Sequence, residues 1–145
     1  MINTQYDMII RSFKEDDFTK YGISCDIPWA DVEKELSMIM LTDDEKVECY
    51  IILEKEGNKC PKKLYDEEMW SYRIADLYVA DTNPFGGTGI TNFIRLFWLI
   101  LSHDDNMSFF WIKKSHPYAK ILEEIDIEED GRYFVYYKSM PYTIY

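Results

Sequence analysis

Three glycines near the middle of the chain could bind an anion. Gly86, Gly87 and Gly89 lie between a strand-like pattern and a helix-like pattern, in the segment Asn83-Pro84-Phe85-Gly86-Gly87-Thr88-Gly89. Such a turn leaves unpaired backbone N–H groups at the start of the helix, where the helix dipole favours negative charge. Glycine also lets a ligand approach the backbone without meeting a Cβ atom. The segment indicates a phosphate-binding turn, with a plain connection as the alternative.

The spacing excludes several common sites. No Lys-Ser or Lys-Thr pair follows the glycines, as a Walker A loop requires, and Gly-Gly-x-Gly is not the Rossmann pattern. The three cysteines, Cys25, Cys49 and Cys60, lack CxxC spacing, so we expect neither a disulfide framework nor a metal site. We interpret His103 and His116 as residues at helix ends rather than as catalysts.

The second half of the chain alternates between strand and helix patterns around the glycine turn. The stretch from Ile90 to His103 is apolar on nearly every face, which indicates a helix packed between a sheet and a second layer. Ser115 suits the N-cap of another helix, with Pro117 in its first turn. Strand patterns precede, separate and follow these two helices, at 70–80, 107–112 and 132–138.

The first half contributes strands that meet in turns. Residues 6–13 and 46–55 are β-type runs, whereas Val32, Leu36 and Ile39 have the spacing of a helix over 31–40. Strands and helices in this order predict an α/β fold in which helices cover a mixed, α+β type of sheet. The length predicts a single domain over residues 1–145.

The charge and aromatic content of the chain limit its partners. The net charge is −11, and the acidic residues are clustered, so we expect no direct binding of nucleic acid. The acidic clusters suit solvated loops, or alternatively an acidic DNA mimic. Aromatic residues make up 17% of the chain, which favours an aromatic-lined groove or interface. Because no signal pattern or membrane-length apolar run is present, we expect a soluble, cytoplasmic protein.

The order strand, glycine turn, buried helix, strand, helix resembles the second half of the GNAT acyltransferase family. Gly87-Thr88-Gly89 is similar to the family's glycine turn, and Ser115-His116-Pro117-Tyr118-Ala119 to its Asn-x-x-x-Ala segment. Ile9-Ile10-Arg11, followed by acidic residues, resembles its first strand. The resemblance implies a GNAT-like fold: a central mixed, mostly antiparallel sheet with helices on both faces. It also implies acetyl-CoA or another acyl-CoA as co-substrate, bound across Gly86, Gly87, Thr88 and Gly89.

The chemistry that this resemblance implies needs a base for the attacking ammonium and donors for the oxyanion. Asp76, on the strand before the turn, is the first candidate for the base, acting directly or through water, and Asp81 is the second. The alternative reading of Asp76 is a solvent-facing charge or an ion-pair partner of Arg73. The oxyanion donors would be backbone N–H groups near Val79 or Ala80.

The sequence departs from the family pattern at two positions. Pro84 stands where the family has Arg or Gln, and Glu123 stands where many members place a tyrosine that protonates the leaving thiolate. A glutamate is ionised near neutrality and is a poor replacement for that acid. Tyr118, Tyr133 and Tyr136 could serve instead, and we take Tyr118 as the candidate.

Two further resemblances define the alternatives. Trp70 and the segment Asn83-Pro84-Phe85-Gly86 are similar to an aromatic strand and turn of the RTX toxin-activating lysine acyltransferases. The size and degenerate motifs also resemble small GNAT-like proteins of tailed phages. The leading hypothesis is an N-acyltransferase that uses acyl-CoA and an amine acceptor. The first alternative is a catalytically inactive, phage-encoded protein that acts in particle assembly or binds a host protein. The acidic DNA mimic is the second.

Overall fold

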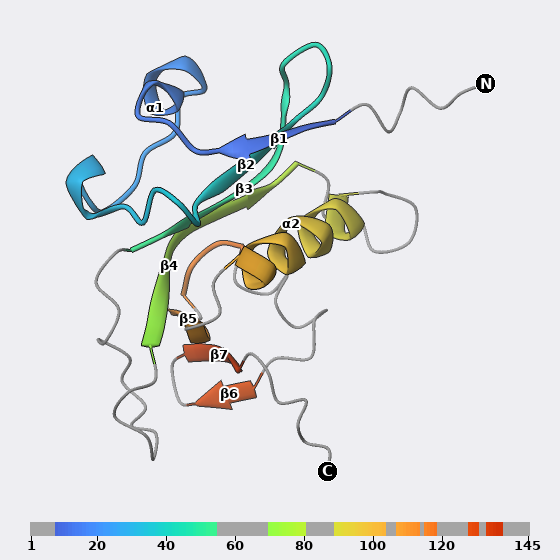
Figure 1. The fold of residues 1–145 in the computed structure, drawn as a ribbon. Helices are drawn as coiled ribbons and strands as arrows, with labels where there is room; N and C mark the ends of the chain where they lie inside the picture. Colours follow the sequence, from blue (N-terminus) through green and yellow to red (C-terminus); the bar gives the residue numbers. More distant parts are fainter. Residues whose placement is uncertain are drawn as a thin grey trace.

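A computed structural model describes residues 8–54, 70–80, 89–103, 107–113, 115–118, 128–130 and 133–137. Seven strands form one sheet in the order β1-β2-β3-β4-β5-β7-β6 (Figure 1). Every neighbouring pair is antiparallel except β4 and β5, which are parallel. The mixed, mostly antiparallel sheet is therefore confirmed. The strands are β1 (Ile9–Ser12), β2 (Met38–Leu41), β3 (Val47–Leu53), β4 (Trp70–Val79), β5 (Met107–Lys113), β6 (Glu128–Asp130) and β7 (Tyr133–Tyr137).

Helices cover both faces of the sheet (Figure 1). Helix α2 (Gly89–His103) buries Phe93, Phe97 and Ile100 against one face, at the spacing that one side of a helix presents. The short helix α1 (Asp16–Lys20) and the 3₁₀ helix η2 (Trp29–Asp31) pack on the other face. Because helices lie on both faces, the strands between them carry nearly continuous apolar runs.

One helix prediction is wrong, and the reason is this burial on both faces. The residues of 31–40 form the end of η2, an irregular stretch and then β2, which pairs with β1 and β3. Val32, Leu36 and Ile39 are all buried, but Val32 and Ile39 reach the core from extended backbone and Leu36 from a turn. All four residues of β2 are buried. A short apolar run of this kind fits a strand with two covered faces as well as it fits a helix.

Two other expectations meet a different outcome. Ser115–Tyr118, expected to open a helix, form a turn, and 119–127 lie outside the described residues. The outer side of α2 was expected to be covered by a second layer, yet Trp98 is 53% exposed.

None of the helices within the described ranges has the length and apolar character needed to cross a membrane. Strand β6 was not predicted.

Strand β4 changes partner along its length, and this change shapes the centre of the molecule. Its first residues pair with β5, up to the match of Arg73 with Trp111. From Ile74 onward, within the described residues, it pairs with β3 alone. The register against β3 shifts at the same place, because Ile52 pairs with Asp76 and Leu53 pairs with Ile74. The extra residue, Ala75, is a β-bulge, which bends the strand and re-aims the side chains beside it.

Candidate functional site

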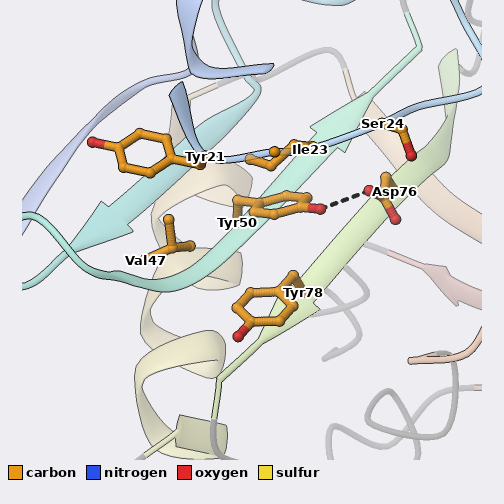
Figure 2. A pocket seen from close by; sticks show the side chains of 8 residues that line it. Tyr21, Ile23, Ser24, Val47, Tyr50, Asp76 and Tyr78 are labelled. Carbon is orange, nitrogen blue, oxygen red and sulfur yellow. Dashed lines mark hydrogen bonds between the residues drawn. The ribbon is translucent and has the colours of Figure 1, made fainter. Parts of the chain in front are cut away.

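A pocket of about 420 Å³ lies on the face of the sheet that carries α1. Its floor comes from two neighbouring strands, because Tyr50 of β3 pairs directly with Tyr78 of β4. Asp76 lies two residues before Tyr78 and therefore faces the same way. Figure 2 shows these side chains together with those from the segment after α1. The pocket is lined by Tyr21, Gly22, Ile23, Ser24, Val47, Tyr50, Asp76 and Tyr78.

The wall opposite the strands exists because α1 stops after little more than one turn. Gly22 has φ +64°, the left-handed conformation that glycine adopts without a Cβ penalty. The Ile23 N–H then donates to the Phe18 carbonyl at 2.9 Å, the backward bond of a Schellman ending. The chain turns back over the sheet, so that Ile23 and Ser24 close one side of the pocket.

The carboxylate of Asp76 accepts hydrogen bonds from two side chains. The Tyr50 hydroxyl donates to Oδ2 at 2.7 Å, and His116 Nε2 lies 2.7 Å from Oδ1. His116 Nδ1 in turn accepts the backbone N–H of Tyr118 at 3.1 Å. Because Nδ1 accepts this bond, Nε2 is the ring nitrogen that donates to Asp76. Asp76 and His116 side chains are each only 17% exposed.

Tyrosine rings surround this network. Tyr50 and Tyr78 stack with ring centroids 5.7 Å apart, and Tyr118 packs edge-on against Tyr78 at 5.4 Å. Burial raises the pKa of Tyr50 well above its usual range, and the hydrogen bond to Asp76 raises it further. Tyr50 therefore keeps its proton and stays a hydrogen-bond donor to the carboxylate.

Arg73 is not the partner of Asp76, contrary to the alternative reading. Its guanidinium forms ion pairs with Asp26 at 3.0 Å and with Glu54 at 2.8 Å. Arg73 is also the last residue of β4 that pairs with β5. One side chain thus ties the loop before η2 to the place where the two strands part.

The structure brings two of the predicted site residues, Asp76 and Tyr118, close together. Asp76 lines the pocket, and Tyr118 connects to it through the His116 ring and through Tyr78. Gly89 is the first residue of α2. Gly86, Gly87 and Thr88 lie outside the described residues, as do Asp81, Pro84 and Glu123.

The two expected oxyanion donors differ in their availability. The Ala80 N–H already donates to the Glu48 carbonyl at 2.8 Å. Backbone N–H groups alternate in direction along a strand, so the N–H of Val79 points to the opposite edge of β4. At that edge β4 has already parted from β5. Val79 is therefore the better-placed donor.

The described part of the expected acyl-CoA site is compatible with that ligand. Helix α2 has no acidic residue in its first turn, which suits phosphate binding at its N-terminus. One negative group lies close by: Glu48 accepts a hydrogen bond from the Asn92 amide at 3.3 Å. Arg95 donates to the same Asn92 side chain, also at 3.3 Å, and partly balances that charge. Within the described ranges no three His, Cys, Asp or Glu side chains gather as a metal site would require.

Sequence reasoning missed Tyr50 and His116. Tyr50 had no local signal, because only the register of β3 against β4 places it on the face that Asp76 shares. His116 had none, because it is 40 residues from Asp76 along the chain. Its expected role at a helix end does not fit the turn at Ser115–Tyr118.

The comparisons with known proteins identify the fold. No protein-family model and no curated protein sequence matches the chain. Among solved structures it is similar to the AtaT toxin, in a mutant form bound to the antitoxin AtaR C-terminus and acetyl-CoA. The TM-score is 0.53 at 13% identity, over 90% of this chain and 93% of that one. A GNAT-family acetyltransferase from Listeria monocytogenes is also similar, with a TM-score of 0.48 at 13% identity, over 90% and 94% of the two chains. The fold is GNAT-like.

Proposed function

We propose that this chain, which has a GNAT-like fold, is an N-acyltransferase that moves an acyl group, most simply acetyl, from acyl-CoA to an amine. The observation that supports the proposal most directly is the position of Asp76. Its carboxylate lines a pocket on β4 just beyond the point where β4 parts from β5. A base on this strand lies next to the edge at which Val79 offers a backbone donor. The solved AtaT complex, with acetyl-CoA bound, supports the same ligand class.

The reaction divides among three groups of this chain. When bound, acyl-CoA supplies an activated thioester carbonyl. Asp76 accepts a proton from the ammonium of the acceptor, directly or through water, so that the free amine nitrogen can attack the carbonyl carbon. The Val79 N–H donates to the carbonyl oxygen as negative charge develops there. Tyr118 donates a proton to the departing sulfur, and its phenolate takes up the proton that the attacking nitrogen loses, so that an amide and a free thiol are the products.

The proposal is tested by thiol release from acetyl-CoA in the presence of a panel of amines. Asp76→Asn should lower kcat/KM by about 10²–10³-fold, the usual contribution of a general base. Asp43→Asn is the matched control, because it removes an exposed carboxylate outside the pocket and should leave the rate unchanged. Equal rates for the two variants, or no heat on titration of acetyl-CoA into high-micromolar protein, would contradict the proposal.

A second candidate is a GNAT-fold protein that has lost catalysis and binds another protein. It is favoured by the Glu48 carboxylate near the start of α2 and by Pro84 in place of the family's Arg or Gln. The solved AtaT structure holds an antitoxin peptide, which supports a protein partner for this fold. Recovery of a stoichiometric partner, with no CoA in the purified material, would support this candidate. The acidic DNA mimic would instead displace DNA from a basic protein.

A further inference from the structure

We infer that the pocket beside Asp76 selects a primary alkylammonium group carried on a slender chain. This inference rests on the proposed function, because it names the class of acceptor that the transferase would use. It follows from the charge of the pocket, from its aromatic walls and from its size.

The charge of the pocket is that of a carboxylate without a permanent cationic partner. Among the described residues, the side chains that bond to Asp76 are the Tyr50 hydroxyl and the His116 ring, and neither is a lysine or an arginine. A carboxylate offers about four lone-pair sites, so positions remain for a further donor. Since the side chain is only 17% exposed, water screens its charge poorly. A ligand with an ammonium head would supply the missing positive charge.

Asp17 shows how the same fold treats a carboxylate that has only a structural role. Asp17 is also buried, but Arg11 binds both of its oxygens at 2.8 Å and the Lys14 N–H donates to it as well. Its charge is neutralised inside the protein. Asp76 lacks such a cation among the described residues and faces a cavity instead. The contrast indicates that Asp76 can accept a cationic ligand, as no lysine or arginine among the described residues pairs with it.

The walls of the pocket suit the rest of such a ligand. Tyr50 and Tyr78 present a stacked aromatic pair along the floor, and Tyr21 lies across from them in the wall after α1 (Figure 2). Aromatic rings attract cations and pack well against methylene groups. Val47 and Ile23 add apolar surface. The cavity of about 420 Å³ is near the lower end of the roughly 300–1,000 Å³ of small-molecule sites, which favours a narrow ligand.

The net charge of the molecule agrees with a cationic ligand. At −11, the chain attracts small cations and repels phosphate-bearing acceptors. An alkylammonium group can belong to a free diamine or to a lysine side chain of a peptide. Both present the same chemistry to Asp76, and the experiment separates them.

The test measures, by NMR or calorimetry and in the absence of acyl-CoA, how tightly the protein binds n-pentylamine and its neutral counterpart n-pentanol. Pentylamine should bind at least about tenfold more tightly than pentanol, because only the amine can pair with Asp76. Asp76→Asn should remove that preference, and Asp43→Asn should keep it. Tyr78→Leu, which retains apolar bulk but loses the aromatic face, should weaken pentylamine binding about threefold. Titration of cadaverine and of a lysine peptide then identifies the source of the group.

The outcomes separate this inference from the proposed function. Equal binding of amine and alcohol, or an amine preference that survives in Asp76→Asn, would overturn the inference even if acyl transfer to another acceptor is found. Selective binding of pentylamine with no acyl transfer would support the inference and count against the transferase. Binding by cadaverine or by the lysine peptide supports the inference, and failure of both overturns it.

Discussion

Two aspartates, Asp17 and Asp76, show how neighbouring groups decide the role of one residue type. Asp17 lies in α1 with its side chain only 3% exposed and bonds to an arginine, whereas Asp76 bonds to a tyrosine hydroxyl and an imidazole beside a pocket. Burial alone would raise the pKa of Asp17. Hydrogen bonds from Arg11 and the Lys14 backbone outweigh burial and hold that pKa below its usual range. The ion pair of Asp17 therefore stabilises the fold, whereas no lysine or arginine among the described residues pairs with Asp76.

Asp17→Asn should lower the free energy of unfolding by about 2–3 kcal/mol at neutral pH, because it leaves Arg11 without its partner. A lowered folded-state pKa contributes stability that is fully present above the unfolded value, about 3.9, and is lost as the pH falls through the folded pKa. The variant should therefore lose less stability than the original protein between pH 5 and pH 2. Urea unfolding across that range measures both effects.

Glu45→Gln is the comparison for that experiment. It breaks the ion pair of Lys20 with Glu45, in which both side chains are more than half exposed. Such surface pairs contribute little, so its unfolding curve should nearly match that of the original protein. Equal losses in the two variants would show that Asp17 is not the stabilising carboxylate described above.

At the scale of elements, the candidate site depends on where two elements change direction. Helix α1 ends at a glycine in the left-handed conformation, which sends Ile23 and Ser24 over the sheet. Strand β4 bulges at Ala75 and leaves β5 after Arg73. Neither feature adds a functional side chain. Both set the space in which Asp76 lies.

Gly22→Ala should cost about 1 kcal/mol of unfolding free energy, the strain of a left-handed residue that carries a Cβ. The space around that Cβ is open, since nothing lies within 4 Å of it, so the cost should come from the backbone alone. Asparagine tolerates this conformation better, and Gly22→Asn should be the milder variant. Denaturant unfolding of the two variants compares them. A cost for asparagine equal to or above that for alanine would exclude backbone strain as the cause.

At the scale of the whole molecule, the protein has one sheet with helices on both faces, and the chain has a strongly negative net charge. The two buried clusters that α2 and the α1–η2 segment form against opposite faces hold the sheet together. A net charge of −11 opposes this compact state through repulsion among the carboxylates. Salt screens that repulsion over distances of about 10 Å at 0.1 M.

Raising NaCl from about 20 mM to about 200 mM should therefore raise Tm by several degrees. A double variant, Asp43→Asn with Glu35→Gln, removes two exposed negative charges and should show a smaller rise. Calorimetry or circular dichroism measures both. A Tm that falls with salt would mean that attractive ion pairs outweigh the repulsion.

Local pattern determined much of this protein from the sequence alone. Periodicity predicted β3, β4, α2, β5 and β7, because the apolar spacing of each reflects the face that it buries. The order of those elements resembles that of the GNAT family and so predicted the GNAT-like fold, which the structural comparison confirms. Asp76 was singled out because it stands on the strand before the glycine turn; the structure places it in the lining of the pocket, and its role as a base stays a prediction.

Only the tertiary structure decided what surrounds Asp76. Tyr50 and His116 lie 26 and 40 residues away along the chain, and no local pattern links positions so far apart. The prediction of a helix over 31–40 was wrong because tertiary packing covers β2 on both faces, and a strand buried in this way does not alternate between apolar and polar residues. Propensity and periodicity act between near neighbours in the sequence. The pocket is made by segments that meet only after the sheet has formed.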